Sequence, residues 1–192
     1  MMQKEKQAES ISSLMLVEGR IRGVYYTCLN DMLPYDDFLF TKRTRRPPED
    51  PINSLISFGN TVLYRKIAKE IYKSRLDIRI GFLHAANRRY ESLNLDIAEI
   101  FRPVIVEKVI FSLINRHMIG ESLHFETLDS GAVYLTNEGK KIFIAELEKK
   151  IAQRMKTESG TISYTELIRA EIQKLVRYFD KDEPYKAYKY FL

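Results

Sequence analysis

The segment Ser92-Leu93-Asn94-Leu95-Asp96-Ile97-Ala98-Glu99-Ile100-Phe101-Arg102-Pro103 sets two carboxylates into an otherwise largely apolar run. Serine is preferred at helix N-termini, so the segment predicts a helix that Ser92 caps and that begins at Leu93. Pro103 should kink or restart this helix, which we expect to continue to about Met118. Apolar residues occupy most of its circumference and leave little of it available to water. The chain is therefore predicted to be built around buried helices.

Apolar residues recur at intervals of three and four along most of the chain, which is the pattern of amphipathic helices. Asp50 followed by Pro51 is a good cap and first-turn pair. Alternating apolar and polar residues over 123–135 predict at most a short β-hairpin. The expected fold class is all-α, a single multi-helix bundle over residues 1–192 with a flexible basic tail from about residue 180. Further helices are predicted over residues 4–33, 51–71, 137–156 and 164–179.

The composition is that of a globular protein with a moderate positive charge. With 192 residues and 45% hydrophobic content, the chain can bury a real core as one domain. Its 31 Lys and Arg against 26 Asp and Glu give a net charge of +5, which favours a polyanionic partner without proving one. Cys28, the single cysteine, lies at helical spacing from apolar neighbours and is expected to be a small core residue. No apolar run approaches the roughly 18 residues that suggest a membrane span, and a cytoplasmic setting follows as the default.

Asp96 and Glu99 are the strongest candidates for chemistry. They lie three residues apart on one helix, so their side chains project from the same face, where two like charges repel unless a cation lies between them. The simpler alternative is a solvated acidic stripe, which the apolar neighbours of both residues disfavour. We favour a functional carboxylate pair.

Two distant segments offer further metal ligands. A lone histidine such as His84 is more often a hydrogen-bonded structural residue, but Arg88 and Arg89 behind it suit a loop that lies against a phosphate backbone. Glu18 lies in the middle of a predicted helix, and its alternative is an ordinary exposed glutamate paired with Arg22 at i, i+4. We interpret the three loci as one metal site that acts on nucleic-acid phosphate, although sequence spacing cannot bring them together.

Basic side chains are available to hold the phosphates. The strongest cluster lies in a proline-rich stretch that cannot be helical and consists of Lys42, Arg43, Arg45 and Arg46. Most such runs are merely solvated. Arg102 has two interpretations that we weigh equally: its planar guanidinium clamps a phosphate, or it forms a salt bridge to Asp96 or Glu99.

Several stretches together resemble a known family. In their order and spacing they are similar to the helical domain of the CRISPR adaptation integrase, the "Cas one" family. The resemblance covers nearly the whole chain. It is carried by Arg46-Pro47-Pro48-Glu49-Asp50-Pro51-Ile52-Asn53-Ser54-Leu55-Ile56-Ser57-Phe58-Gly59, by Gly81-Phe82-Leu83-His84, by the 92–103 segment and by Gly131-Ala132-Val133-Tyr134-Leu135-Thr136.

This resemblance implies a DNA-cleaving and DNA-joining enzyme that inserts captured fragments into a CRISPR array. Carried over by position, the family's metal ligands are Glu18, His84 and Glu99, with Asp96 one turn before as an alternative ligand or as a carboxylate that supports the ligands. Oxygen ligands suit Mg²⁺ or Mn²⁺, and the imidazole shifts the preference toward Mn²⁺. The expected DNA contacts are Arg43, Arg45, Arg46, Arg88, Arg89 and Arg102.

The resemblance is to the catalytic part of the family only. Family members carry an N-terminal β-rich domain that supplies most of the homodimer contact, and no segment of this sequence corresponds to it. The implied partners are double-stranded or branched DNA, the small "Cas two" protein and, for full-length members, a second copy. The main alternative is a non-catalytic, basic helical DNA-binding module. A weaker alternative is a helical regulator that binds a protein partner through Phe58, Tyr64 and Tyr72.

Overall fold

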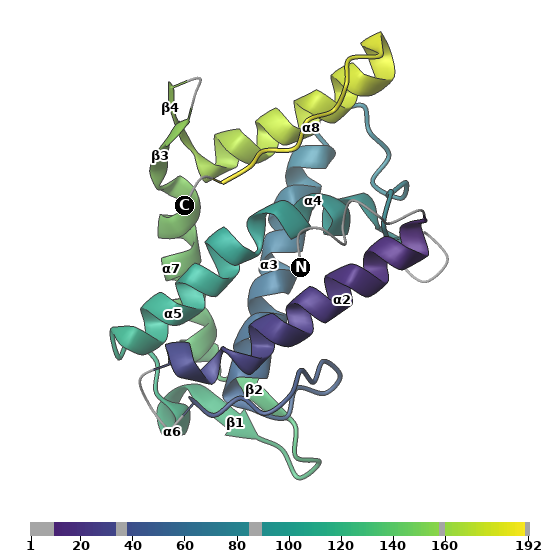
Figure 1. Ribbon diagram of the computed structural model, residues 1–192. Helices are drawn as coiled ribbons and strands as arrows, with labels where there is room; N and C mark the ends of the chain where they lie inside the picture. The colour runs from purple at the N-terminus through teal and green to yellow at the C-terminus, as the bar shows by residue number, and fades with distance from the viewer. Residues whose placement is uncertain (1–9, 34–37, 85–89, 158–159, 191–192) are drawn as a thin grey trace.

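The computed structural model describes residues 10–33, 38–84, 90–157 and 160–190, which form a helical bundle with two small β-hairpins. Its helices are α2 (Ile11–Thr27), α3 (Pro51–Ile71), α4 (Leu93–Phe101), α5 (Lys108–Asn115), α6 (Glu121–His124), α7 (Asn137–Ala152) and α8 (Tyr164–Lys181), with a 3₁₀ turn over Asn30–Met32 and a π-helical turn, η4, over Pro103–Glu107. α3 runs through the middle of the bundle (Figure 1). The predicted mainly helical fold class is confirmed. None of the helices in the described ranges is long and apolar enough to cross a membrane.

α3 begins where its sequence predicts and is the central core helix. Asp50 has an extended backbone, and its carboxylate accepts a hydrogen bond from the Asn53 N–H at 2.7 Å. At Gly59 an added Cβ would lie 2.6 Å from Val106 Cγ1 and 2.7 Å from Phe143 Cζ, so η4 and α7 approach the helix too closely for a side chain there. The fully buried side chains of α3 include Leu55, Leu63, Ile67 and Ile71.

The helix predicted over 93–118 forms as three consecutive pieces. α4 begins at Leu93 as expected, Pro103 opens η4, and α5 ends at Asn115, short of the predicted end. Because proline has no N–H, it interrupts the regular helical hydrogen-bond ladder, and the chain continues through a wider turn. The predicted restart at Pro103 is therefore confirmed.

The structure contains one predicted hairpin and one that was not predicted. β1 (Phe125–Thr127) pairs antiparallel with β2 (Val133–Leu135), as expected. β3 (Arg154–Thr157) pairs antiparallel with β4 (Gly160–Ser163), where the helix of 137–156 was predicted to continue. That helix ends at Ala152 because Gln153 already has an extended ψ of 129°. The expectation of at most one hairpin was therefore wrong.

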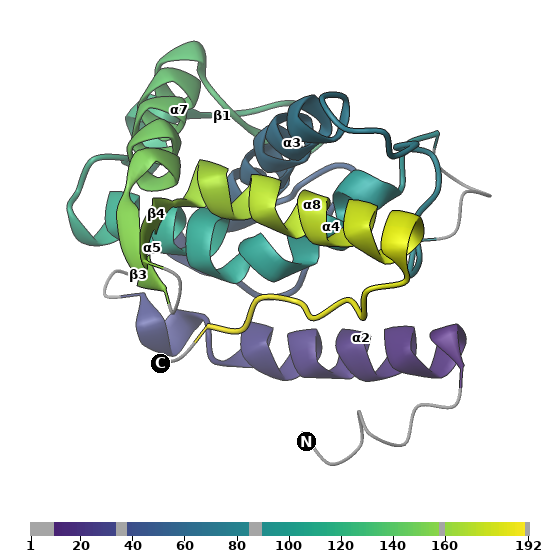
Figure 2. The same cartoon turned by 90° about the horizontal axis from the view of Figure 1, so that it is seen from above.

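α2 forms a layer of its own. Figure 2 shows it beside the rest of the bundle, with the C-terminal segment running in this view between α2 and α8. The helix predicted over 4–33 is confirmed for Ile11–Thr27, capped by Ser10, and residues 1–9 lie outside the described part of the chain. Cys28 is exposed, so the prediction that it is a core residue was wrong. Several apolar side chains of α2 are also exposed, namely Ile11, Met15, Leu16 and Val24.

The C-terminal segment follows α8 back across the bundle. Glu171 of α8 is fully buried and accepts hydrogen bonds from Tyr185 Oη at 2.9 Å and from the Tyr188 N–H at 3.2 Å. Tyr185 and Tyr188 also pack against the hydrophobic core. This part of the chain is thus held on the bundle, where we expected a free tail.

Candidate functional site

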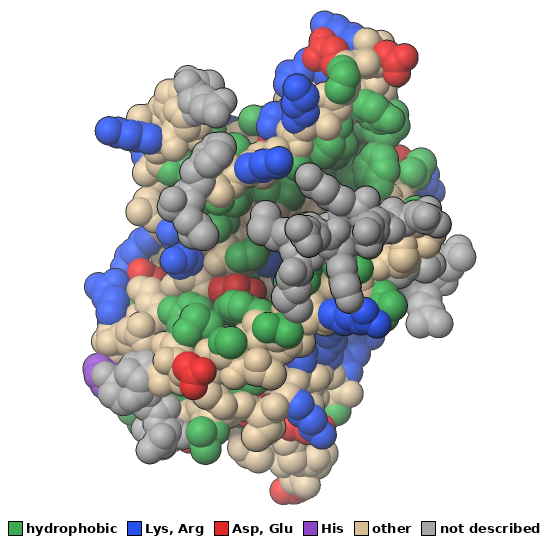
Figure 3. Space-filling view, viewed as in Figure 1, with side chains coloured by type: hydrophobic (Ala, Val, Ile, Leu, Met, Phe, Trp, Pro, Cys, Tyr) green, Lys and Arg blue, Asp and Glu red, His purple; other side chains and the backbone are tan. Residues whose placement is uncertain are grey.

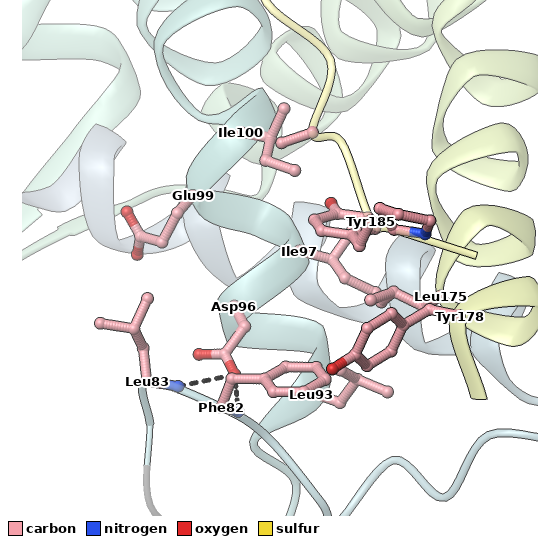
Figure 4. A pocket seen from close by; sticks show the side chains of 12 residues that line it. Phe82, Leu83, Leu93, Asp96, Ile97, Glu99, Ile100, Leu175, Tyr178 and Tyr185 are labelled. Carbon is pink, nitrogen blue, oxygen red and sulfur yellow. Dashed lines mark hydrogen bonds between the residues drawn. The ribbon is translucent and has the colours of Figure 1, made fainter. Parts of the chain in front are cut away.

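Asp96 organises the loop that carries His84. Its carboxylate accepts hydrogen bonds from the backbone N–H groups of Phe82, Leu83 and His84, at 3.1 Å for Leu83 and 3.0 Å for His84. The ring nitrogen Nδ1 of His84 lies 2.6 Å from Asp96 Oδ1. Figure 4 shows Asp96 pointing from α4 to the backbone of Phe82 and Leu83. One carboxylate therefore holds three consecutive residues and orients the imidazole.

These donors keep Asp96 ionised. Burial alone would raise the pKa of its carboxyl, but the hydrogen bonds from the His84 side chain and from the three N–H groups outweigh burial and hold the pKa below its ordinary value. An ionised carboxylate can only accept hydrogen bonds, so Nδ1 of His84 carries the hydrogen. In the neutral imidazole the lone pair is then on Nε2, which is the usual arrangement of a metal-binding histidine held by a carboxylate.

Ser92 supports the same loop instead of capping α4. It occupies the predicted N-cap position, but its side chain makes no cap hydrogen bond. Its Oγ donates to the Arg79 carbonyl at 2.7 Å and accepts from the Gly81 N–H at 2.9 Å. At Gly81 an added Cβ would lie 2.7 Å from Asp96 Oδ2. The loop therefore lies against the start of α4 so closely that it requires a glycine.

Charged side chains form a continuous chain of ion pairs between α2 and α4. Arg22 Nε lies 2.8 Å from Glu18 Oε1, which is the i, i+4 contact that was the alternative interpretation of Glu18. The same guanidinium donates through Nη2 to Glu99 Oε2. Glu99 Oε1 accepts from Arg102 Nη1 at 2.8 Å, and Arg102 Nε donates to Asn60 at 3.1 Å. Arg22 thus joins two of the residues predicted as metal ligands.

The three predicted ligands face one cavity. It has a volume of about 650 Å³, and Glu18, His84 and Glu99 line it together with Arg22 and Arg102. Within the described ranges, no three His, Cys, Asp or Glu side chains are arranged to hold a metal ion. The donor types, two carboxylates and an imidazole with a free Nε2, suit Mg²⁺ or Mn²⁺. The set fits such an ion in its chemistry, and the Arg22 guanidinium lies between the two carboxylates.

The predicted phosphate contacts of the 41–50 loop differ in exposure. Arg45 and Arg46 are exposed and line the cavity. Arg43 also lines it, but its guanidinium is half-buried and donates to Asn53 Oδ1 at 2.6 Å and to Ser57 Oγ at 2.9 Å. Figure 3 shows Lys and Arg side chains gathered beside α2, on the side of this loop. Arg45 and Arg46 are therefore the basic residues best placed to meet a phosphate.

The other predicted phosphate contacts are less available. Arg102 is only 8% exposed, and of its two interpretations the structure contains the salt bridge to Glu99. Arg88 and Arg89 lie outside the described residues.

Sequence reasoning gave Arg22 and Asn60 no role in the site. Arg22 was considered only as a partner of Glu18, and its contact with Glu99 spans 77 residues, for which no local pattern exists. Asn60 is 7% exposed and lies on α3, the central core helix. A polar residue within an apolar helical pattern was the available signal for Asn60, because buried polar groups need a partner.

A second cavity lies on the other side of α4. Its volume is about 640 Å³, and its lining is largely apolar and aromatic. In Figure 4, Ile97 and Ile100 point toward Tyr185, whereas Glu99 points away from it. Asp96 and Glu99 also line this cavity, so α4 lies between a charged cavity and a largely apolar one, and Glu99 borders both.

The fold and the site define a helical domain in which two helices, α2 and α4, each carry a glutamate into a cavity edged by arginines. The profile of a family described as "CRISPR associated protein Cas1" matches residues 1–149. The chain therefore belongs to the Cas1 family, and the resemblance seen in its motifs is confirmed.

Known proteins extend this similarity to both ends of the chain. A CRISPR-associated endonuclease Cas1 from Clostridium perfringens is 46% identical over 188 residues, which are 96% of this chain and 56% of that protein. A CAS1 protein from Thermotoga maritima superposes with a TM-score of 0.85 at 36% identity, over 97% of this chain and 57% of that one. A Cas6-RT-Cas1–Cas2 complex matches with a TM-score of 0.86 at 25% identity, over 98% of this chain and 21% of that one. The chain spans about half the length of the curated relatives it matches.

Proposed function

We propose that this chain is the catalytic helical part of a metal-dependent DNA endonuclease and integrase that joins captured DNA to a CRISPR repeat array. One observation carries the proposal: Glu18, His84 and Glu99, from three separate segments, line one cavity that Arg45 and Arg46 also line. The relative from Clostridium perfringens is named an endonuclease, which supports the nuclease class. Membership of the Cas1 family supports the link to CRISPR.

In this proposal Glu18, His84 and Glu99 hold Mg²⁺ or Mn²⁺. When bound, the ion polarises the scissile phosphate and stabilises the charge that develops on its oxygens. Asp96 keeps the hydrogen of His84 on Nδ1, so the lone pair of Nε2 stays available to bind the metal. Arg102, held by Asn60, stays beside Glu99 and offsets part of the acidic charge that would repel a phosphate.

The basic loop positions the DNA backbone. Arg45 and Arg46 bind phosphate oxygens, and Arg43 fixes the loop that presents them through its bonds to Asn53 and Ser57. Such contacts set the register of the DNA without reading its sequence. In cleavage, water attacks the phosphorus, and a P–O bond of the DNA strand breaks. In joining, a DNA 3′-hydroxyl is the nucleophile, and the new P–O bond replaces the one that breaks.

We further propose that the chain acts with a Cas2 protein. Support comes from the Cas6-RT-Cas1–Cas2 complex, which contains a fold that superposes on 98% of this chain. Homodimer formation stays an expectation that the resemblance implies for full-length members of the family.

A non-catalytic DNA-binding module is the second candidate. One observation favours it, because no three potential ligands in the described part of the chain are arranged to hold an ion. DNA binding would then depend steeply on salt, with about −0.9 in the log–log slope for each neutralised phosphate, and would be indifferent to Mn²⁺ and EDTA.

A strand-transfer assay separates the two candidates. Branched DNA with a labelled strand is incubated with the purified chain in Mn²⁺, Mg²⁺ or EDTA, and products are resolved on a denaturing gel. We expect cleaved or joined strands only with metal, their loss in Glu18→Gln and His84→Ala, and full activity in Glu138→Gln, which alters an exposed carboxylate on α7. If the chain bound DNA tightly but formed no product with either metal, the enzymatic proposal would be wrong.

A further inference from the structure

We propose that Arg22 is an internal cation that takes the place of the divalent metal and must leave Glu18 and Glu99 before the metal binds. The inference rests on the proposed function and concerns the control of the same site. Arg22 is the only residue in the described ranges whose side chain bonds to both of these carboxylates.

One cation bridges two anions. Nε and Nη2 are adjacent donors on one edge of the planar guanidinium, and they bind Glu18 Oε1 and Glu99 Oε2 respectively. The two carboxylates therefore lie side by side along that edge. Without a cation between them their charges would repel. The guanidinium supplies one positive charge to a place where a divalent ion would supply two.

The guanidinium and the metal exclude one another. Arg22 and Arg102 together occupy both oxygens of Glu99, and Arg22 also occupies Oε1 of Glu18, so an ion that bridges the two carboxylates competes with Arg22 for these oxygens. Binding of the ion is therefore a competition in which the carboxylates exchange one cation for another. The apparent metal affinity is reduced by the free energy of the two ion pairs.

Arg22 is held less tightly than Arg102. Arg22 belongs to α2, in which none of the residues with a described burial is fully buried, and its side chain is 22% exposed. Arg102 also pairs with Glu99, but its side chain is only 9% exposed and is tied to Asn60. Of the two arginines on Glu99, Arg22 is thus the one that can be displaced.

A third cavity, next to the one that Glu18, His84 and Glu99 line, can receive the displaced guanidinium. Arg22 also lines a neighbouring cavity of about 540 Å³, together with Lys42, Arg43 and Arg45. Gly23 lines the same cavity, and nothing lies within 4 Å of a Cβ added to it, so α2 leaves room there. A DNA phosphate among these basic groups would bind the released side chain. Metal binding and phosphate binding would then favour each other, because each draws Arg22 from the same contacts.

The test is the affinity for Mn²⁺ alone, measured from the signal of the free ion in electron paramagnetic resonance. We expect Arg22→Gln to bind Mn²⁺ about tenfold more tightly than the unaltered chain, the order expected for losing two partly exposed ion pairs. Arg22→Lys should lie between the two, because a single ammonium replaces a two-donor edge. Equal or weaker binding by Arg22→Gln would overturn the proposal.

Two further variants make the result specific. Arg45→Gln removes a positive charge from the same cavity without removing a bond to either carboxylate, and it should tighten Mn²⁺ binding by less than about threefold. If Arg45→Gln raised the Mn²⁺ affinity as much as Arg22→Gln, the effect would be general repulsion between Mn²⁺ and positive charges, and the proposal would be overturned. His84→Ala should weaken binding in every background; if it has no effect, Mn²⁺ binds elsewhere, and the metal site of the proposed function fails as well.

Thermal unfolding distinguishes competition from a structural role. In EDTA, Arg22→Gln should melt at a lower temperature than the unaltered chain, because Glu18 and Glu99 lose the cation that joins them. Saturating Mn²⁺ should then raise its melting temperature by more than it raises that of the unaltered chain. A purely structural arginine would lower both melting temperatures equally, and that result would overturn the proposal.

Discussion

Asp96 and Glu99 project from one face of α4, one turn apart, but their surroundings differ. Asp96 is held by three backbone N–H groups and by His84, all from the loop that it organises. Glu99 is held by the guanidinium groups of Arg22 and Arg102. Backbone donors cannot leave without unfolding the loop, whereas a long arginine side chain can rotate away. A fixed carboxylate and an exchangeable one can therefore lie side by side on one helix.

The largest effect is expected from the exchangeable carboxylate. Glu99→Gln keeps the shape and one hydrogen-bond acceptor but removes the charge that would hold the metal. We expect at least about a 10²-fold loss of strand transfer, the order seen when one charge-stabilising group is removed from an active site. Stability should fall by about 1 kcal/mol, because the pair with Arg22 is partly exposed, and the nearly buried Arg102 keeps its bond to Asn60 and an amide oxygen as acceptor.

Gel-based rates and urea unfolding of Glu99→Gln measure the two effects. Glu138→Gln, on the exposed side of α7, is the matched control: it should leave the rate unchanged and cost less than about 1 kcal/mol, because Glu138 lies in the first turn of the helix. A loss of several kcal/mol with little loss of rate would show that Glu99, like Asp96, is chiefly structural.

Replacing the fixed carboxylate, Asp96, should affect stability more than replacing Glu99 does. Asp96→Ala leaves the N–H groups of Phe82, Leu83 and His84 without their acceptor, so we expect a loss of about 1–3 kcal/mol of stability. Without its carboxylate His84 loses its orientation, which should weaken Mn²⁺ binding by about 10–100-fold. Calorimetric titration of Mn²⁺ and urea unfolding check both values.

The pH dependence of the same residue sharpens this prediction. The folded pKa of Asp96 lies below its ordinary value, so its contribution is complete above the unfolded pKa of about 3.9 and is lost as the pH falls through the folded value. The stability difference between Asp96→Asn and the unaltered chain should therefore shrink as the pH falls below about 4. A difference that grew below about pH 4 would contradict an ionised, hydrogen-bonded Asp96.

The smallest effect concerns the glycine beside Asp96. Gly81→Ala would place a Cβ 2.7 Å from Asp96 Oδ2, so the loop must shift, and we expect a loss of about 1 kcal/mol with a modest loss of Mn²⁺ affinity. Gly19→Ala on α2 is the matched control, since nothing lies within 4 Å of its added Cβ. That variant should be neutral or more stable by up to about 1 kcal/mol, because alanine favours helices. Urea unfolding of both variants tests the contrast, and equal behaviour would contradict the close packing of the loop.

Local signals were sufficient for much of the fold. The Asp50–Pro51 start of α3 and the restart at Pro103 depend on residues within a few positions, and both were predicted. The start of α4 at Leu93 was also predicted, although the Ser92 side chain does not cap it. The β3–β4 hairpin was missed because helical periodicity continues past Ala152. Its signal was Gly160, whose φ of +124° favours glycine, followed by β-branched residues that favour strands.

The sequence by itself determined which ligand types are present, the shared helical face of Asp96 and Glu99, and the pairing of Glu18 with Arg22. Each of these depends on neighbours along the chain, which the helical repeat brings together. Only the tertiary structure decided that Asp96 fixes His84 and that Arg22 reaches Glu99 across 77 residues. Those contacts depend on how the 81–84 loop and α2 lie against α4, and the free energy of that packing is spread over the whole core, where no short pattern records it.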